Sequence, residues 1–271
     1  MPDDVIQGAL FGSLDAEPAV PAPAPGELRV CALNINNPSV QHAQQTLAWL
    51  LAGRSDVLVL TELKASDGAK LIISGLAAEG FEVCLPPGWA DGSYFTVVAT
   101  RGLPQTSVDG PGDPRVVAVD VEHASRQIRI IGLYGPTNGM TTDSSDRRRA
   151  FQKTFLEYLH TALRPRLLLA GDLNVVEPGH QPPLASFEEH DYAFYTGLQR
   201  LGLADAFRQA HPAARDHSWI SDRYGAQRLD HLFATPATGT LVNCGYDHTP
   251  RTSHITDHAA LLATFALGTS A

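Results

Sequence analysis

The sequence predicts an α/β (α+β) protein in which mixed sheets pack together and helices lie outside them. Short apolar runs of strand length alternate with longer segments of helical periodicity. No internal repeat is visible, so the runs read as the parts of packed layers. Hydrophobic residues make up 44% of the 271 residues, which is enough for a sizeable core.

Taken in order, each predicted strand is an apolar run that ends at polar or turn-forming residues. The predicted strands cover residues 28–33, 56–60, 81–85, 94–100, 115–121, 127–134, 166–170, 217–221, 227–234, 241–246 and 259–265. The predicted helices cover residues 40–51, a segment leading to residue 81, residues 146–163 and a region near 191–207, with a polar loop at 137–146. In the third helix, Phe151, Phe155, Leu156 and Leu159 form an apolar stripe at helical spacing.

The first 27 residues stand apart from the rest of the chain. Residues 16–26 are rich in alanine and proline, a composition typical of a semi-rigid extended linker. We therefore predict a disordered tail over 1–27 and a single domain over 28–271. Ahead of the linker, residues 5–11 form a short apolar island, which is typical of a docking peptide. Two alternatives stay open: the island packs on its own domain, or it remains disordered.

The composition excludes several classes of protein. No apolar run approaches transmembrane length, and the acidic start of the chain is unlike a basic secretory signal. The three cysteines are widely spaced and odd in number, which argues against a metal motif and a disulfide framework. We therefore expect a cytoplasmic protein with no membrane association. The formal charge of −9 does not favour nonspecific nucleic-acid binding, although acidic metal ligands inflate the count and a basic patch can be local.

The most informative stretch is 167–174, an apolar strand that stops at Gly171 and then presents Asp172 and Asn174. On an extended chain, side chains two positions apart point the same way. Open α/β sheets hold their ligands at the carboxyl ends of strands. We therefore expect Asp172 and Asn174 to reach one functional site.

Other polar residues recur in or beside apolar strands, mostly at the strand ends. The full set is Asn34, Glu62, Tyr134, Asp172, Asn174, Asp230, Asp257 and His258. Each alone has an ordinary structural explanation, since Asn forms turns and Glu is usually solvated. Asp230 is harder to explain, because a carboxylate within an apolar strand needs a partner. Adjacent strand residues face opposite ways, so His231 is expected to be a packing or surface histidine. Together, the eight residues indicate one catalytic centre.

These motifs resemble the endonuclease/exonuclease/phosphatase superfamily, and within it the abasic-site endonucleases of the exonuclease III type. The resemblance runs from about residue 28 to the C-terminus, in the order of the superfamily. It rests on Leu33-Asn34-Ile35-Asn36, Leu60-Thr61-Glu62-Leu63-Lys64, Leu133-Tyr134-Gly135-Pro136, Gly171-Asp172-Leu173-Asn174, Arg228-Leu229-Asp230 and Thr256-Asp257-His258-Ala259, with the stretch 202–208 typical of the nuclease branch. The resemblance implies a four-layered α/β/β/α sandwich of two packed sheets flanked by helices.

The resemblance and the residue chemistry together imply a magnesium-dependent phosphodiesterase. Glu62 is a hard oxygen ligand suited to Mg²⁺, for which Mn²⁺ is expected to substitute. Asn34 and Asp257 are expected to contribute by holding the residues and waters around this ion or by forming a second metal position. A phosphodiester needs its developing charge neutralised and an in-line water activated.

The remaining residues receive catalytic roles. Asp172 is the predicted general base, or in a variant of the mechanism the acid that protonates the leaving group. Asn174 is expected to orient water or phosphate. Asp230 is expected to pair with His258 and to hold the imidazole as a charged donor to phosphate. Tyr134 offers its hydroxyl to the same phosphate.

For the substrate, we expect duplex DNA with an abasic site or a 3′-end lesion, cut by a monomeric enzyme of DNA repair associated with the nucleoid. Trp219, Arg115 and Arg149 are the predicted substrate-binding residues. The short segment between Trp219 and Arg228 departs from the family pattern, and Gln227 stands where an apolar residue often lines the abasic pocket.

Two alternatives accompany this hypothesis. A phosphodiesterase or phosphatase of the same superfamily acting on a small molecule or lipid would fit the acidic charge balance. A catalytically silent binding module would need substitutions at the site residues, and none of these residues is replaced by one unable to act in catalysis.

In the tail, Gln7, Leu10 and Phe11 have the spacing of the peptide with which bacterial DNA enzymes bind the sliding clamp, so the clamp is a predicted partner.

Overall fold

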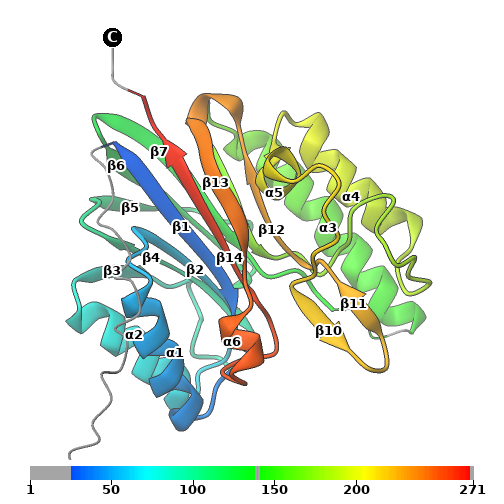
Figure 1. Cartoon of the computed structure of the whole chain (residues 1–271), viewed down its shortest axis with the longest axis horizontal. Helices are drawn as coiled ribbons and strands as arrows, with labels where there is room; N and C mark the ends of the chain where they lie inside the picture. Colours follow the sequence, from blue (N-terminus) through cyan, green and yellow to red (C-terminus); the bar gives the residue numbers. More distant parts are fainter. Residues whose placement is uncertain (1–25, 138, 140, 269–271) are drawn as a thin grey trace, which may run out of the picture.

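The computed structural model describes residues 26–137, 139 and 141–268. Two six-stranded sheets pack together, with helices on both outer faces, as the sequence predicts (Figure 1). The helices α1 (Val40–Ala52) and α2 (Asp67–Ala78) cover the first sheet, and α3 (Thr142–Ala162) and α4 (Glu189–Arg200) cover the second. The predicted tail falls almost wholly outside the described residues, and so do Gln7, Leu10 and Phe11.

The first sheet brings two strand ends to the same edge. Its order is β13-β14-β1-β2-β4-β3, and among these neighbours only β1 and β2 are parallel. The strands are β1 (Glu27–Asn34), β2 (Val57–Leu63), β3 (Phe81–Cys84), β4 (Phe95–Arg101), β13 (Thr240–Asp247) and β14 (Ala260–Ala266). Asn34 lies opposite Thr61 in the β1–β2 register. Asn34 and Glu62 therefore emerge side by side.

The second sheet brings the carboxylates of Asp172 and Asp230 together. Its order is β5-β6-β7-β8-β12-β9, and among these neighbours only β7 and β8 are parallel. The strands are β5 (Gln105–Val108), β6 (Val116–His123), β7 (Arg126–Leu133), β8 (Leu167–Asp172), β9 (Ala204–Asp205) and β12 (Asp230–Ala234). Because β12 is antiparallel to β8, Asp230 lies directly opposite Asp172.

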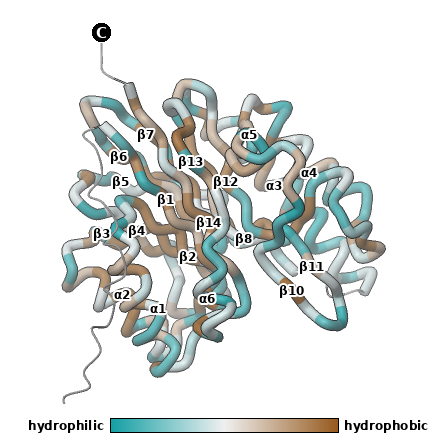
Figure 2. The backbone as a smooth tube through the Cα atoms, in the orientation of Figure 1, coloured by the Kyte–Doolittle hydropathy of each residue, from teal (hydrophilic) through white to brown (hydrophobic). Residues whose placement is uncertain are grey.

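The central strands β1, β2, β4, β8 and β12 bury both of their faces, which explains why they read as nearly continuous apolar runs (Figure 2). On β1, Val30 and Ala32 lie in the core between the sheets, whereas Cys31 and Leu33 pack with the core under α1 and α2. This alternation follows from the two-residue period of a strand. The result is a sandwich core between the sheets and two outer cores beneath the helices.

Helix α3 begins at Thr142, four residues before the predicted start, so part of the predicted loop is helical. A capping box explains the earlier start. Thr141 accepts a hydrogen bond from the backbone N–H of Ser144, and Ser144 accepts one from the N–H of Thr141. The predicted stripe is confirmed, because Phe155 and Leu159 are buried and Phe151 and Leu156 pack beside them.

Several short elements differ from the sequence prediction. The predicted strand 227–234 is two strands, because β11 (Gly225–Gln227) pairs with β10 (Trp219–Ser221) in a separate hairpin and only β12 joins the large sheet. The predicted helical region 191–207 is interrupted by β9 before α5 (Ala206–Ala210). The structure adds β5, η1 (Pro236–Thr238) and α6 (Thr249–Thr252), which the sequence did not indicate. Within the described part of the chain, no helix combines the length and apolar character needed to cross a membrane.

Candidate active site

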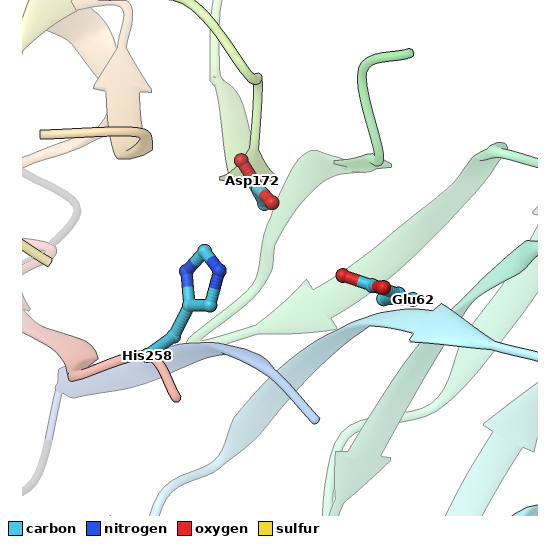
Figure 3. A group of neighbouring side chains, drawn as sticks. All are labelled: Glu62, Asp172 and His258. Carbon is cyan, nitrogen blue, oxygen red and sulfur yellow. The ribbon is translucent and has the colours of Figure 1, made fainter. Parts of the chain in front are cut away.

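The polar residues predicted at strand ends meet at one edge of the two sheets. Glu62 from β2, Asp172 from β8 and His258 from the segment before β14 surround one space (Figure 3). One ligand-type atom from each residue lies within 4.8 Å of the others. Residues from three separate strand ends thus form a single centre.

The backbone around Asp172 explains how β8 delivers its carboxylate. Gly171 has a φ of 136°, and a Cβ at this position would lie 2.2 Å from the carbonyl oxygen of Leu133. Glycine is therefore required for the close approach of β8 to β7. The strand then ends at Asp172, and Asn174 adopts a left-handed φ of 51°.

The prediction that Asp172 and Asn174 meet is confirmed, but its stated reason is wrong. They meet through a turn, not along an extended strand. The backbone N–H of Asn174 donates to Asp172 Oδ1 over 2.9 Å, and Asn174 Nδ2 donates to Asp172 Oδ2 over 3.2 Å. A second bond from Nδ2 to the carbonyl oxygen of Gly135, at 2.9 Å, holds the amide in place.

Asn34 joins the two carboxylates that come from different sheets. Its Nδ2 donates to Glu62 Oε2 over 2.7 Å and to Asp172 Oδ2 over 2.8 Å. Tyr134 is buried and hydrogen-bonded to Glu62. Burial and the neighbouring charges of Asp172 and Glu62 raise the pKa of Tyr134, so its hydroxyl remains a protonated donor.

The predicted pair of Asp230 and His258 is present. His258 Nδ1 lies 2.7 Å from Asp230 Oδ2, and both side chains are buried. Burial alone would lower the pKa of His258, but the charge and hydrogen bond of Asp230 and the charge of Asp172 raise it to about 10. The imidazole is therefore a charged donor at neutral pH. His231, on the opposite face of β12, is buried and contacts the carbonyl oxygen of Val175 over 2.9 Å, as expected of a packing histidine.

The carboxylates form a centre that suits a divalent cation. Burial is the largest cause that raises the pKa of both Asp172 and Glu62, and the charge of Asp230 adds to it at Asp172. Among the described residues, the buried Asp230 Oδ1 has no hydrogen-bond partner. A cation beside these oxygens would favour their charged forms, and Mg²⁺ prefers carboxylate ligands. The donor set of Glu62 and Asp172 fits such an ion.

The other two predicted metal ligands lie beside this centre. The amide nitrogen of Asn34 bridges the carboxylates, and its oxygen accepts the N–H of Asn36 over 2.9 Å. Asp257 is exposed at the rim, where it accepts hydrogen bonds from Trp219 Nε1 and Asn36 Nδ2, each 3.0 Å long. Among the His, Cys, Asp and Glu side chains of the described residues, Glu62, Asp172 and His258 are the group whose ligand-type atoms lie close enough to share one ion.

A cavity of about 310 Å³ opens onto the carboxylates. The predicted substrate residue Trp219 is part of its wall, whereas neither Arg115 nor Arg149 is among the described residues that line it. The lining consists of Glu62, Thr137, Arg148, Asp172, Asn174, Ser186, Phe187, Trp219, Tyr224, Gln227, Leu229, Asp257 and His258. Arg149 is exposed and pairs with acidic neighbours, and the Arg115 guanidinium lies 6.0 Å from the ring of Phe151.

Arg149 was the predicted substrate-binding arginine of α3, but among the described residues it is Arg148 that lines the cavity. Its side chain is buried, lies 2.8 Å from Asp191, and donates to the carbonyl oxygen of Asn174 over 2.7 Å. Helical spacing was the available signal, because Arg148 lies on the buried face of α3 with Gln152 and Phe155. Arg149 is one position out of phase with that face.

Comparison with known proteins agrees with this geometry. The sequence pattern of the Endonuclease/Exonuclease/phosphatase family matches residues 31–258. The chain belongs to this family. The match includes both sheets' contributions to the site, from Asn34 to His258.

Solved structures share the fold of this family member at low sequence identity. An AP endonuclease from Archaeoglobus fulgidus is 20% identical with a TM-score of 0.70, and the match covers 88% of this chain and 99% of the other. The 3′ phosphatase NExo from Neisseria, bound to a product DNA hairpin, is 23% identical with a TM-score of 0.73 and the same coverage. The 3′-5′ exonuclease NExo from Neisseria meningitidis is 23% identical with a TM-score of 0.71, again with the same coverage.

For a member of the Endonuclease/Exonuclease/phosphatase family, the arrangement has a direct chemical meaning. Hydrolysis of a phosphoester requires a group that accepts a proton from water and donors for the charge that develops on phosphate. The site holds the buried carboxylate of Asp172, the half-buried carboxylate of Glu62, the charged imidazole of His258 and the protonated hydroxyl of Tyr134 around one space. These groups supply what the hydrolysis of a phosphoester requires.

Proposed function

We propose that this chain is a metal-dependent DNA phosphodiester hydrolase of DNA repair, acting as an abasic-site endonuclease, a 3′-5′ exonuclease or both. One observation carries the proposal. The Glu62 and Asp172 carboxylates, bridged by Asn34, face the Asp230–His258 pair at the mouth of a cavity that has Trp219 in its wall. The similar folds of an AP endonuclease and of NExo, the latter with a DNA product, support DNA as the substrate.

Asp172 is the general base of this proposal. Asn34 and Asn174 fix its orientation through three side-chain and backbone hydrogen bonds, and burial and the charge of Asp230 raise its pKa, which makes its carboxylate a stronger base. The same carboxyl would protonate the leaving oxygen if the roles in the mechanism were reversed. Asn174, held by Gly135, orients the attacking water or the phosphate.

His258 and Tyr134 stabilise the phosphate in this proposal. The charged imidazole of His258, held by Asp230, and the hydroxyl of Tyr134 donate to phosphate oxygens as negative charge develops. Glu62 would hold Mg²⁺ or Mn²⁺, with Asn34 and Asp257 at its periphery. When bound, the ion would supply charge neutralisation on the phosphate.

The partner proposals rest on sequence patterns. Arg115 and Arg149 would contact the DNA backbone outside the cavity, and Gln7, Leu10 and Phe11 would recruit the enzyme to the sliding clamp in the cytoplasm. An isothermal titration of the N-terminal peptide against sliding clamp measures this directly. We expect heat with a low micromolar midpoint, and no heat at high micromolar peptide would end the clamp proposal.

A second candidate is a phosphodiesterase of small molecules or lipids, which the net charge of −9 favours. Salt dependence separates the two functions, because contacts with several DNA phosphates release counterions and weaken as salt rises. We expect duplex hydrolysis with Mg²⁺ to fall steeply between about 50 and 200 mM salt and to cease with EDTA. Hydrolysis of a bis-aryl phosphodiester with no action on any duplex would favour the second candidate.

A further inference from the structure

The cavity beside Asp172 has walls of two chemical kinds. Three aromatic rings, from Phe187, Trp219 and Tyr224, supply flat apolar surface. A buried amide, Gln227, supplies hydrogen-bonding capacity. An apolar wall alone would suit any compact apolar group, whereas the amide narrows the choice of ligand.

The aromatic walls are held in place by contacts with other residues of the cavity wall. Trp219 and Tyr224 lie nearly parallel, with ring centroids 6.4 Å apart and planes at 26°, and the Trp219 indole donates to Asp257. On another part of the wall, the Arg148 guanidinium lies 5.2 Å from the centroid of Phe187. Fixed rings of this kind form stacking surfaces for another planar group.

Gln227 presents a matched donor and acceptor. It lies opposite Trp219 in the β10–β11 hairpin and is 6% exposed. Its Nε2 donates one hydrogen to the carbonyl oxygen of Tyr224 over 2.9 Å. Among the described residues, nothing bonds its Oε1 or its second amide hydrogen, so one acceptor and one donor remain side by side.

A planar ring that carries a donor and an acceptor on one edge fits both walls, and the nucleobases have this chemistry. At about 310 Å³, the cavity lies at the lower end of the range of small-ligand pockets, about 300–1,000 Å³. We infer that the cavity binds an intact nucleobase of the nucleotide next to the scissile phosphate, with Gln227 hydrogen-bonded to the base edge. This inference rests on the proposed DNA hydrolase function.

The inference has a consequence for substrate choice. A base-free sugar would leave the amide of Gln227 without a partner on the substrate, and a buried polar group without a partner is costly. The enzyme should therefore process a nucleotide that retains its base at least about tenfold more efficiently than its base-free analogue. The base would come either from a frayed 3′ terminus or from a nucleotide extruded within the duplex.

The test measures kcat/KM on four end-labelled duplexes. Two carry the nucleotide at a recessed 3′ end and two carry it internally, each pair with an intact or a base-free nucleotide at the cutting position. We expect the base-bearing member of one pair to be preferred about tenfold, and the pair that shows it identifies the source of the base. Gln227→Leu should collapse this ratio toward one, whereas Gln199→Leu, on the exposed face of α4, should retain it.

The outcomes separate this inference from the proposed function. If the wild type cuts none of the duplexes, both are overturned. If it cuts DNA with no preference for the base, or if Gln227→Leu lowers both rates by the same factor, only this inference is overturned. Should Gln227→Leu fail to fold, Gln227→Met replaces it, and fluorescence anisotropy in EDTA then compares binding of base-bearing and base-free 3′ ends.

Discussion

Arg228→Met would remove the centre of a buried ion-pair network behind the active site. The Arg228 side chain is fully buried, and its Nη2 lies 2.8 Å from Asp205 Oδ2 and 2.7 Å from Glu177 Oε2. The network joins the chain just before Asp230 to the chain just after Asn174. It therefore ties together the two backbone segments that carry catalytic side chains.

The expected loss of stability depends on the partners that Asp205 and Glu177 keep when Arg228 is replaced. Asp205 still accepts hydrogen bonds from Tyr195 and from the N–H of Arg208, and Glu177 still pairs with the Arg208 guanidinium. Breaking a buried ion pair by removing one partner typically costs about 3–5 kcal/mol. Because neither carboxylate becomes wholly unpartnered, we expect about 3 kcal/mol. At about 2–4 °C per kcal/mol for a domain near this size, the melting temperature should fall by roughly 6–12 °C.

A double-mutant cycle with Asp205→Asn provides the assay. The free energies of unfolding of the two single variants and the double variant are measured in urea. We expect a coupling energy of at least about 1 kcal/mol, because each substitution removes the partner of the other. Arg147→Met, which breaks an exposed pair with Asp143, should change stability by less than about 0.5 kcal/mol. If the stability losses of Arg228→Met and Asp205→Asn add up to the loss of the double variant within about 0.5 kcal/mol, the reasoning is refuted.

Three further predictions concern the same regions. Burial would raise the pKa of Asp205, but the charge of Arg228 holds it well below its usual range. The resulting stabilisation is complete above the pKa of about 3.9 that Asp205 has in the unfolded chain, and it is lost as the pH falls below that value. Between about pH 6 and pH 3, the free energy of unfolding should therefore fall more in the wild type than in Asp205→Asn. Equal slopes of this free energy against pH in the two proteins would contradict the prediction. Gly135→Ala would place a Cβ 2.1 Å from the carbonyl oxygen of Leu173, in the turn after β8. We expect the free energy of unfolding to fall by about 1–3 kcal/mol and the rate of hydrolysis to fall about 100-fold. An unchanged rate would show that the turn adapts. Arg148→Met should cost about 3 kcal/mol in thermal unfolding and Arg149→Met less than about 0.5, and similar losses in both variants would show that burial does not distinguish them.

The polar residues singled out at strand ends meet in the structure because chemistry and strand position coincide there. Asp230 stood out as a carboxylate within an apolar strand, and its buried pairing with His258 is the partner that such a group requires. The stretch ending in Asp172 read correctly as a buried strand. These inferences needed only periodicity and the cost of burying a charge.

Sequence reasoning did less well where long-range contacts decide the structure. The break between β11 and β12 depends on pairing with β10, which local pattern does not reveal. The bridge from Asn34 to Asp172 spans 138 positions and depends on how the two sheets pack. The burial of Arg148 could have been predicted from its position on the apolar face of the helix, but its partner Asp191 lies on another helix. Local sequence thus gives the functional groups, and sheet packing gives their mutual geometry.

The most direct test of the proposed chemistry is the single-turnover hydrolysis of an end-labelled duplex that carries one abasic-site analogue and a recessed 3′ end, with Mg²⁺. The wild type is compared with Asp172→Asn and with Asp143→Asn, a matched change at an exposed carboxylate of α3. We expect cleavage at the analogue, at the 3′ end or at both, a loss of at least about 1,000-fold in Asp172→Asn, and no loss in Asp143→Asn. Full activity of a folded Asp172→Asn variant would contradict the assignment of Asp172 as the residue that moves the proton.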